Sequence, residues 1–450
     1  MVNSWLFQRL SEFKDETAII WQDQKYSYRQ ILDGVLKWYN ILEEYGIKQG
    51  ESVAIYGDFS PNVTCLILSL IKNNNIAVPL TSSMFPTLED CLKIARATCL
   101  FEFNDSDSFN FRRINNNPDH PLLEDLRKNN DSGLIIFTSG STGEMKAALH
   151  SFTKVISKFK KKGQPFVTLA FLLFDHIGGI NTLFGSLTSC GKIILGVKRE
   201  PEFICKMIEQ YKVNLLGATP TFLKILLMSD SYKKYNLSSL KLITYGTEPM
   251  TKATLDTLNT TFPDVKFKQL YGLSESGVLP TKSENSGSLN LVVGGEGCEA
   301  KVIDGIIYIK TDFLMIGYLN APSPSVDSDG WYRTGDMAEI KANGNIRILG
   351  RESELINVGG EKVFPAEVEN VIMQMYNIKD VIVRGKPNPV TGHIVYAKVE
   401  IIEPEDPDKI EVRVRKFCAK HLPQYKIPAV VEISNTNLHN GRFKKIRRVV

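Results

Sequence analysis

The 450-residue sequence lacks the marks of several large protein classes. Its seven cysteines are dispersed, with no C-x-x-C pair and no zinc-ligand spacing, which argues against a disulfide framework and indicates reduced thiols. The net charge of +4 is small and gives no reason to expect nucleic acid or a membrane surface as a partner. No apolar stretch approaches membrane-spanning length, and the first residues lack a basic and then apolar leader. We therefore expect a cytoplasmic protein without a membrane span.

Two common nucleotide-binding motifs are also missing. A Walker loop needs G-x-x-x-x-G-K-[ST], but Gly140 and Gly143 are too close together and Lys146 precedes Ala147. No G-x-G-x-x-G opens a helix, so a dinucleotide-binding fold has no support. Basic residues cluster only locally, at 158–162 and 442–448, and we expect both runs to be solvated faces.

What the sequence does contain is a hydroxyl-rich turn after a predicted buried strand at 134–137. The glycines of the turn allow backbone N–H groups to face an anion, and its hydroxyls and lysine add donors and positive charge. A Gly/Ser surface turn is the plainer interpretation of so short a motif, but the whole run favours a polyphosphate site. Its members are Thr138, Ser139, Gly140, Ser141, Thr142, Gly143 and Lys146.

Strands and helices alternate through the middle of the chain. We predict strands at 192–197, 213–217, 240–245 and 265–270, helices at 201–211, 220–228 and 250–262, and a further helix and strand within 58–80. Such crossovers require a mostly parallel sheet, and ligands bind beyond the carboxyl ends of its strands. The residues at those ends are Gly246, Thr247, Glu248, Tyr271 and Gly272.

Beyond residue 290 the pattern changes to alternation around Asp304-Gly305 and Asn343-Gly344, which are hairpin signals. The fold class that we predict is α/β: an N-terminal domain of mostly parallel sheets flanked by helices, with a small antiparallel β region, and a smaller C-terminal α+β domain. The large domain would span 1–349, a hinge 350–353 and the small domain 354–450. Within the small domain we predict helices at 365–375 and 407–421, and strands at 380–384 and 393–402.

Two carboxylates stand at predicted turns. Glu275, in the segment 271–275, could hold a magnesium ion that bridges ATP phosphates, although a loop carboxylate is the plainer interpretation. Asp336, in the segment 332–336, can accept hydrogen bonds from two adjacent ribose hydroxyls, with an Asx turn as the alternative. An esterase elbow is excluded at the first segment, because Ser276 stands where G-x-S-x-G needs glycine.

In the same order along the chain, these motifs resemble those of the adenylate-forming superfamily, which includes acyl- and aryl-CoA synthetases, peptide-synthetase adenylation domains and luciferases. The phosphate loop departs from the family only at Met145, and Tyr332-Arg333-Thr334-Gly335-Asp336 matches in full. The resemblance implies that Lys146, Thr138 and Thr142 are catalytic, that Glu275 and Thr142 are metal ligands, and that Asp336 and Arg351 contact ribose or phosphate. It also implies a nucleotide site and a glycine-rich loop that rotation of a mobile C-terminal domain brings in for the thioester step. The nucleotide site comprises Gly246, Thr247, Glu248, Leu270, Tyr271, Gly272 and Ser274, and the loop contains Gly359 and Gly360.

The segment 174–179 resembles the acid pocket of acyl- and aryl-CoA ligases. His176 would lie near the acid and orient it, with a core or capping histidine as the plainer alternative. Asp175 supports another interpretation, since peptide-synthetase domains carry an aspartate here that pairs with the amino group of an amino acid.

The chain departs from the family at two further places. The usual terminal G-K pair is Gly441-Arg442, so that Arg442, or the nearby Lys444 and Lys445, would supply positive charge at the reacting carboxylate. The hinge position, usually aspartate, is Ser353.

The resemblance implies ATP-dependent activation of a fatty or aryl acid to an acyl-adenylate, with release of pyrophosphate, and then transfer to a thiol. The acceptor would be coenzyme A or the phosphopantetheine of an acyl carrier protein, the cofactor Mg²⁺, and the assembly a monomer or homodimer. Two alternatives stay open. One is a stand-alone amino-acid adenylation enzyme that loads a carrier protein, and the other is an inactive ATP-binding partner or scaffold protein.

Overall fold

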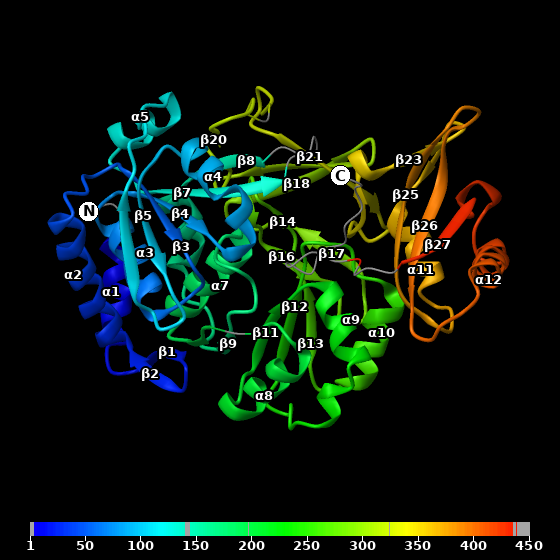
Figure 1. Cartoon of the computed structure of the whole chain (residues 1–450), viewed down its shortest axis with the longest axis horizontal. Helices are drawn as coiled ribbons and strands as arrows, with labels where there is room; N and C mark the ends of the chain where they lie inside the picture. Colours follow the sequence, from blue (N-terminus) through cyan, green and yellow to red (C-terminus); the bar gives the residue numbers. More distant parts are fainter. Residues whose placement is uncertain (1–3, 140–144, 197, 324, 435–437, 439–450) are drawn as a thin grey trace.

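A computed structural model describes residues 4–139, 145–196, 198–323, 325–434 and 438. The N-terminal part contains two seven-stranded sheets and a six-stranded antiparallel sheet, and a separate C-terminal unit lies beside it (Figure 1). Within the described residues, no helix has both the length and the apolar character needed to cross a bilayer.

The first sheet carries the predicted phosphate loop at one end. Its strands follow the order β20 (Gly317–Tyr318), β8 (Met145–Ser151), β7 (Gly133–Ser139), β4 (Ile76–Leu80), β3 (Ser52–Tyr56), β5 (Ala97–Phe103) and β6 (Phe109–Arg113). The central strands β7, β4, β3 and β5 are parallel, and the outer strands join them antiparallel. One face of this sheet packs against α4 (Leu88–Ile94) and α5 (Pro121–Lys128).

The second sheet holds the predicted βα series. Its order is β13 (Lys266–Gln269), β12 (Leu242–Tyr245), β11 (Leu215–Ala218), β9 (Val167–Leu169), β10 (Lys192–Ile194), β1 (Thr17–Trp21) and β2 (Gln24–Ser27). All of its pairings are parallel except that of β1 with β2. The N-terminal hairpin β1–β2 completes a sheet built mainly from residues 167–269, a long-range pairing that the sequence pattern does not indicate.

Helices fill the space between these sheets and cover the outside of the second. The largest core cluster joins both sheets with α1 (Ser4–Glu12), α2 (Tyr28–Glu44), α3 (Pro61–Lys72), α6 (Phe152–Ser157) and α7 (Ile177–Leu187). Helix α3 is buried on nearly every side, which explains why its sequence is apolar all round. A second cluster packs the other sheet against α8 (Pro201–Tyr211), α9 (Pro220–Met228) and α10 (Lys252–Thr261).

The predicted antiparallel region is the third sheet. Its order is β16 (Thr281–Ser283), β17 (Asn290–Val293), β22 (Ile346–Arg351), β21 (Tyr332–Ile340), β19 (Ile306–Thr311) and β18 (Cys298–Ile303). The turn between β18 and β19 places Asp304 and Gly305 at φ of 49° and 76°, as a tight hairpin with the sequence Asp-Gly requires. A short hairpin of β14 (Gly272–Leu273) and β15 (Gly277–Val278) precedes this sheet.

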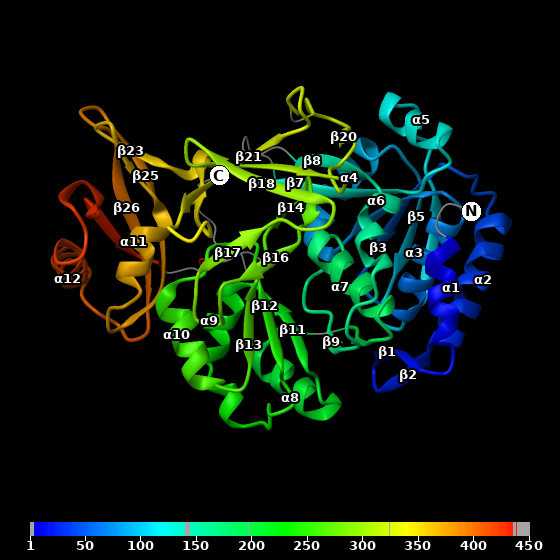
Figure 2. The same ribbon diagram turned by 180° about the vertical axis from the view of Figure 1, so that it is seen from behind.

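The C-terminal unit has its own core. It combines β23 (Ile356–Val358), β24 (Glu361–Val363), β25 (Ile378–Asn388), β26 (Gly392–Ile401) and β27 (Val430–Ile433) with α11 (Pro365–Ile372) and α12 (Pro407–Ala419). Figure 2 shows α11 beside the lobe of α9 and α10, and α12 on the far side of the unit. Lys224 of α9 joins the two parts, because its ammonium lies 2.8 Å from a carboxylate oxygen of Asp380 on β25.

The predicted fold class is confirmed, and several elements match their predicted bounds closely. Helices α8 and α9 span the predicted residues, and the Thr219 hydroxyl accepts a hydrogen bond from the backbone N–H of Phe222 at the start of α9. The division of the chain at 350–353 stays a prediction. In the structure Gly350 and Arg351 still belong to β22, and a short 3₁₀ turn, Glu352–Glu354, follows.

Candidate active site

Strands β7 and β8 place Thr138 opposite Lys146 in an antiparallel register. The turn between these strands lies outside the described residues, and with it Gly140, Ser141, Thr142 and Gly143. The backbone of Ser139 pairs with that of Met145. The described part of the predicted phosphate loop therefore consists of the end of β7 and the start of β8, where Lys146 stands.

Tyr318 links Lys146 to the predicted metal ligand. The Lys146 ammonium lies 5.3 Å from the centroid of the Tyr318 ring, and the Tyr318 hydroxyl donates to a carboxylate oxygen of Glu275. The Asn320 side chain fixes the backbone on both sides of Lys146, since its amide donates to Met145 O at 2.7 Å and accepts from Ala147 N at 3.0 Å. Tyr318 and Asn320 were not predicted from the sequence, because they come from β20 and the segment after it, far from both motifs in the chain.

Glu275 stands in the turn of the β14–β15 hairpin. Its backbone oxygen accepts from Met315 N at 2.7 Å, so the turn is anchored from outside the hairpin. In the described part of the chain, no group of three histidine, cysteine, aspartate or glutamate side chains could hold a metal ion. One carboxylate beside a tyrosine and a lysine fits Mg²⁺, which binds through one or two carboxylates and takes its remaining ligands from phosphates and water.

A buried carboxylate lies on the other side of the site. Asp336 accepts a hydrogen bond from the Tyr271 hydroxyl at 2.8 Å and forms an ion pair with the Arg351 guanidinium, whose Nε lies 3.1 Å from the second carboxylate oxygen. Burial raises the pKa of Asp336, and the Arg351 charge opposes this shift. Burial disfavours the charged form of Arg351, but Asp336 and Glu275 together raise its pKa above the ordinary value. Each oxygen of Asp336 keeps a second lone pair, so the carboxylate can still accept from a ligand.

A cavity of about 120 Å³ lies at the carboxyl ends of β11, β12 and β13, and Tyr271 and Arg351 are among the residues that line it. The lining residues include eight that the sequence analysis proposed: His176, Gly246, Thr247, Leu270, Tyr271, Gly272, Ser274 and Arg351. Other lining residues were not predicted: Gly217 and Ala218 at the end of β11, and Asn181 and Thr182 in the first turns of α7. The rule that ligands bind at strand ends pointed to the first pair, since the strand at 213–217 was predicted.

His176 and Asp175 have different surroundings. The His176 side chain is the N-cap of α7, where Nδ1 accepts from Gly178 N at 3.0 Å, and it also lines the cavity. Asp175 is buried and accepts from the Thr81 hydroxyl at 2.8 Å. The described residues that line the cavity do not include Asp175.

Glu248, Gly359 and Gly360 are not among the residues that line the cavity. The Glu248 carboxylate accepts from Thr221 N at 2.8 Å, at the start of α9, so that its side chain faces the C-terminal unit. Gly359 and Gly360 form the exposed turn between β23 and β24. Arg442, like Lys444 and Lys445, lies outside the described residues. The proposed roles of all these residues stay predictions.

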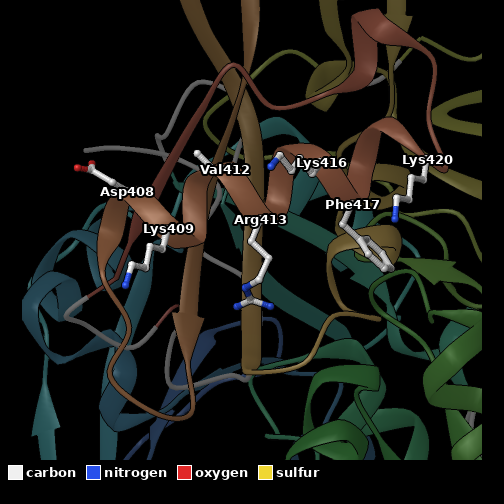
Figure 3. Close-up of a pocket in the computed structure, with 7 residues that line it drawn as sticks. All are labelled: Asp408, Lys409, Val412, Arg413, Lys416, Phe417 and Lys420. Atoms are coloured by element: carbon white, nitrogen blue, oxygen red, sulfur yellow. The ribbon is translucent and has the colours of Figure 1, made fainter.

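A larger hollow, of about 630 Å³, lies over α12 in the C-terminal unit (Figure 3). All of its lining residues come from this one helix and its C-cap: Asp408, Lys409, Val412, Arg413, Lys416, Phe417 and Lys420. Because polar groups from separate elements do not converge there, the hollow lacks the character of an active site.

His150 lies behind the site on β8, four residues after Lys146, and is almost fully buried. Burial lowers the pKa of its imidazole to about 4, although the backbone of Ser274 favours the charged form and Lys158 disfavours it. In the unfolded chain the imidazole takes up its proton near pH 6.5, so the unfolded chain binds more protons between pH 6.5 and 4. Stability should therefore fall as the pH drops through this window.

Replacing His150 with phenylalanine is expected to remove this acid sensitivity. Between pH 7 and pH 5 the free energy of unfolding of the original chain should fall by about 2 kcal/mol more than that of the variant. Urea unfolding at the two pH values measures this difference. Equal losses would show that His150 is not held neutral by the fold.

The fold and the cavity define a two-part α/β protein with its candidate site at the strand ends. Two family models match the chain. The model described as "AMP-binding enzyme" matches residues 6–319, and the model described as "AMP-binding enzyme C-terminal domain" matches residues 367–442. The chain therefore belongs to the AMP-binding enzyme family, and its resemblance to the adenylate-forming superfamily is confirmed. It is a ligase of the AMP-forming, acyl-CoA synthetase-like class.

Similar proteins support the same placement. The 2-succinylbenzoate–CoA ligases of Bacillus cereus and Listeria monocytogenes are each 25% identical, and the alignments cover 99% and 96% of this chain and 97% and 95% of theirs. The anthranilate CoA ligase AuaEII in complex with anthranoyl-AMP shares the fold with a TM-score of 0.84 at 18% identity, covering 99% of this chain and 95% of that one. The o-succinylbenzoate CoA synthetase of Bacillus subtilis, with its acyl-adenylate intermediate, has a TM-score of 0.77 at 21% identity, covering 98% and 96%.

Proposed function

We propose that this chain activates a fatty or aryl carboxylic acid with ATP and transfers the acyl group to coenzyme A. The observation that carries the proposal is that two charged clusters adjoin one cavity at the strand ends. Lys146, Tyr318 and Glu275 form one cluster, and Asp336 with Arg351 forms the other. Arg351 and Tyr271 line the cavity themselves, and Ser274, next to Glu275, does so too.

Each cluster would hold a different part of the nucleotide. The Asp336 carboxylate would accept hydrogen bonds from the ribose hydroxyls, with Tyr271 and Arg351 fixing its orientation. Lys146 would neutralise charge on the phosphates, and Asn320 keeps its strand in place. A magnesium ion bound at Glu275 would neutralise further phosphate charge.

The reaction that these groups support has two steps. An oxygen of the substrate carboxylate attacks the α-phosphorus of ATP, a P–O bond forms, and the bond to pyrophosphate breaks. The sulfur of the thiol then attacks the acyl carbon, a C–S bond forms, the C–O bond to AMP breaks, and the thiol proton is released. Positioning and charge neutralisation by the protein would account for most of the rate enhancement.

The amino-acid alternative is not favoured. Asp175, its main support in the sequence, is buried against Thr81 at the end of β4. The similar proteins named above are ligases that make coenzyme A thioesters. We therefore retain coenzyme A as the proposed acceptor.

A pyrophosphate-release screen over fatty, aryl and amino acids tests the proposal, with AMP measured in parallel. We expect release with one class of fatty or aryl acid and a thioester when coenzyme A is added. Release confined to amino acids would reject the proposal. Release of no pyrophosphate with any acid would favour an inactive ATP-binding protein, and thioester formation only with a carrier protein would change the acceptor.

A further inference from the structure

Lys158, at the start of the basic run 158–162, is not a solvated surface lysine. Its ammonium donates to Val278 O at 2.8 Å and lies 5.3 Å from the centroid of the Phe159 ring and 5.8 Å from that of Phe313. The expectation of a solvated face is therefore wrong at this position. It is confirmed at 160–162, where the lysines are exposed.

The carbonyl that Lys158 holds belongs to the hairpin that carries Glu275. Val278 pairs with Gly272, so the two strands β14 and β15 move together. The hairpin is tightly closed, because a Cβ at Gly272 would lie 2.3 Å from Gly277 O. Val278 also lines the cavity. Lys158 thus ties the base of this hairpin to the segment that follows β8 and α6.

Stability does not explain a lysine in this place. Burial lowers the pKa of its ammonium to about 7, which means that the surroundings disfavour the charge. Within the described residues it pairs with no carboxylate, and the titratable group that faces it is His150 of β8, itself held neutral. An apolar side chain would fill the same space without a partly buried charge.

We propose that Lys158 is a positioning residue, which holds the β14–β15 hairpin so that Glu275 is fixed for the magnesium ion of Mg·ATP. The proposal rests on the function proposed above. Three contacts hold the hairpin. Lys158 binds the Val278 carbonyl at its base, and Met315 N binds the Glu275 backbone oxygen in its turn. The Tyr318 hydroxyl binds the Glu275 side chain. Replacing a side chain that orients a metal ligand commonly lowers the affinity for the metal about 10-fold or more.

Calorimetry of ATP binding to the full chain tests the proposal, with Mg²⁺ and separately with EDTA. For Lys158→Met we expect the gain in ATP affinity due to Mg²⁺ to fall about 10-fold, while the affinity in EDTA is unchanged. Lys158→Arg, which keeps a donor, should retain part of the gain. Lys161→Met, an exposed lysine of the same run, is the matched control and should behave as the original chain.

Thermal unfolding separates positioning from a structural role. Lys158→Met should unfold at a temperature no lower than the original chain at pH 6, since a partly buried charge is removed. An unchanged Mg²⁺ effect in Lys158→Met, or a loss of affinity in EDTA together with a lower unfolding temperature, would overturn the proposal. If the original chain gained no affinity for ATP from Mg²⁺, the magnesium role of Glu275 and the proposal would both be wrong. If a Lys158→Met variant released pyrophosphate and kept the full Mg²⁺ effect, the positioning role of Lys158 would be rejected and the proposed function would stand.

Discussion

Replacing Asp336 with asparagine should weaken ATP binding by about 10- to 100-fold. The variant keeps the shape of the side chain but removes the charge, so the Arg351 guanidinium loses the carboxylate it is paired with and the ribose hydroxyls lose a strong acceptor. Calorimetry with ATP measures the affinity, and the loss should be of similar size for AMP because both carry the ribose.

Glu352→Gln is the control for this experiment. Glu352 also pairs with an arginine, Arg333, but both side chains are about half exposed and lie away from the lining of the cavity. Surface pairs of this kind contribute little, so the control should bind ATP as the original chain does. Equal affinity of the Asp336→Asn variant and the control would remove the basis for the ribose assignment.

Replacing Glu275 with glutamine should lower the rate of pyrophosphate release by about 100- to 1,000-fold, because the proposed metal ligand loses its charge. Glutamine still accepts from the Tyr318 hydroxyl, so the hairpin should keep its position. The affinity for ATP in EDTA should change little, which distinguishes a lost metal ligand from a disturbed fold.

Tyr318→Phe gives the matched comparison. This variant removes the hydroxyl beside Glu275 but keeps the ring near Lys146 and the carboxylate itself. We expect a decrease of about 10- to 100-fold, as for a single hydrogen bond to a charged group. A larger effect in Tyr318→Phe than in Glu275→Gln would contradict the assignment of Glu275 as the metal ligand.

The sequence predicted those parts of the fold that depend on local patterns. Periodicity and capping signals fixed α8 and α9, because proline at the first turn and threonine as N-cap act within a few residues. The strand-end rule placed Gly246, Thr247 and Tyr271 at the cavity. The Asp304-Gly305 hairpin followed from the backbone angles that its turn requires.

Features that depend on long-range packing were not accessible in this way. The pairing of β1 with β10 joins residues about 170 positions apart, and no local signal specifies it. Tyr318 contacts the β14–β15 hairpin from more than 40 residues away in the chain, and Lys158 from more than 100. A single tyrosine or lysine forms no sequence motif from which such a contact could be predicted. Glu248 stands at a strand end as predicted, yet its side chain faces α9, since a free N–H at the start of a helix attracts a carboxylate.

The central claim is that a carboxylate of the substrate attacks the α-phosphorus of a nucleotide held in this cavity. An acid that supports turnover, labelled with ¹⁸O in its carboxylate, tests the claim directly when the products are analysed by mass spectrometry. We predict that one ¹⁸O atom appears in AMP and none in pyrophosphate or inorganic phosphate. Label in inorganic phosphate, with ADP as the nucleotide product, would show attack at the γ-phosphorus and would contradict the account.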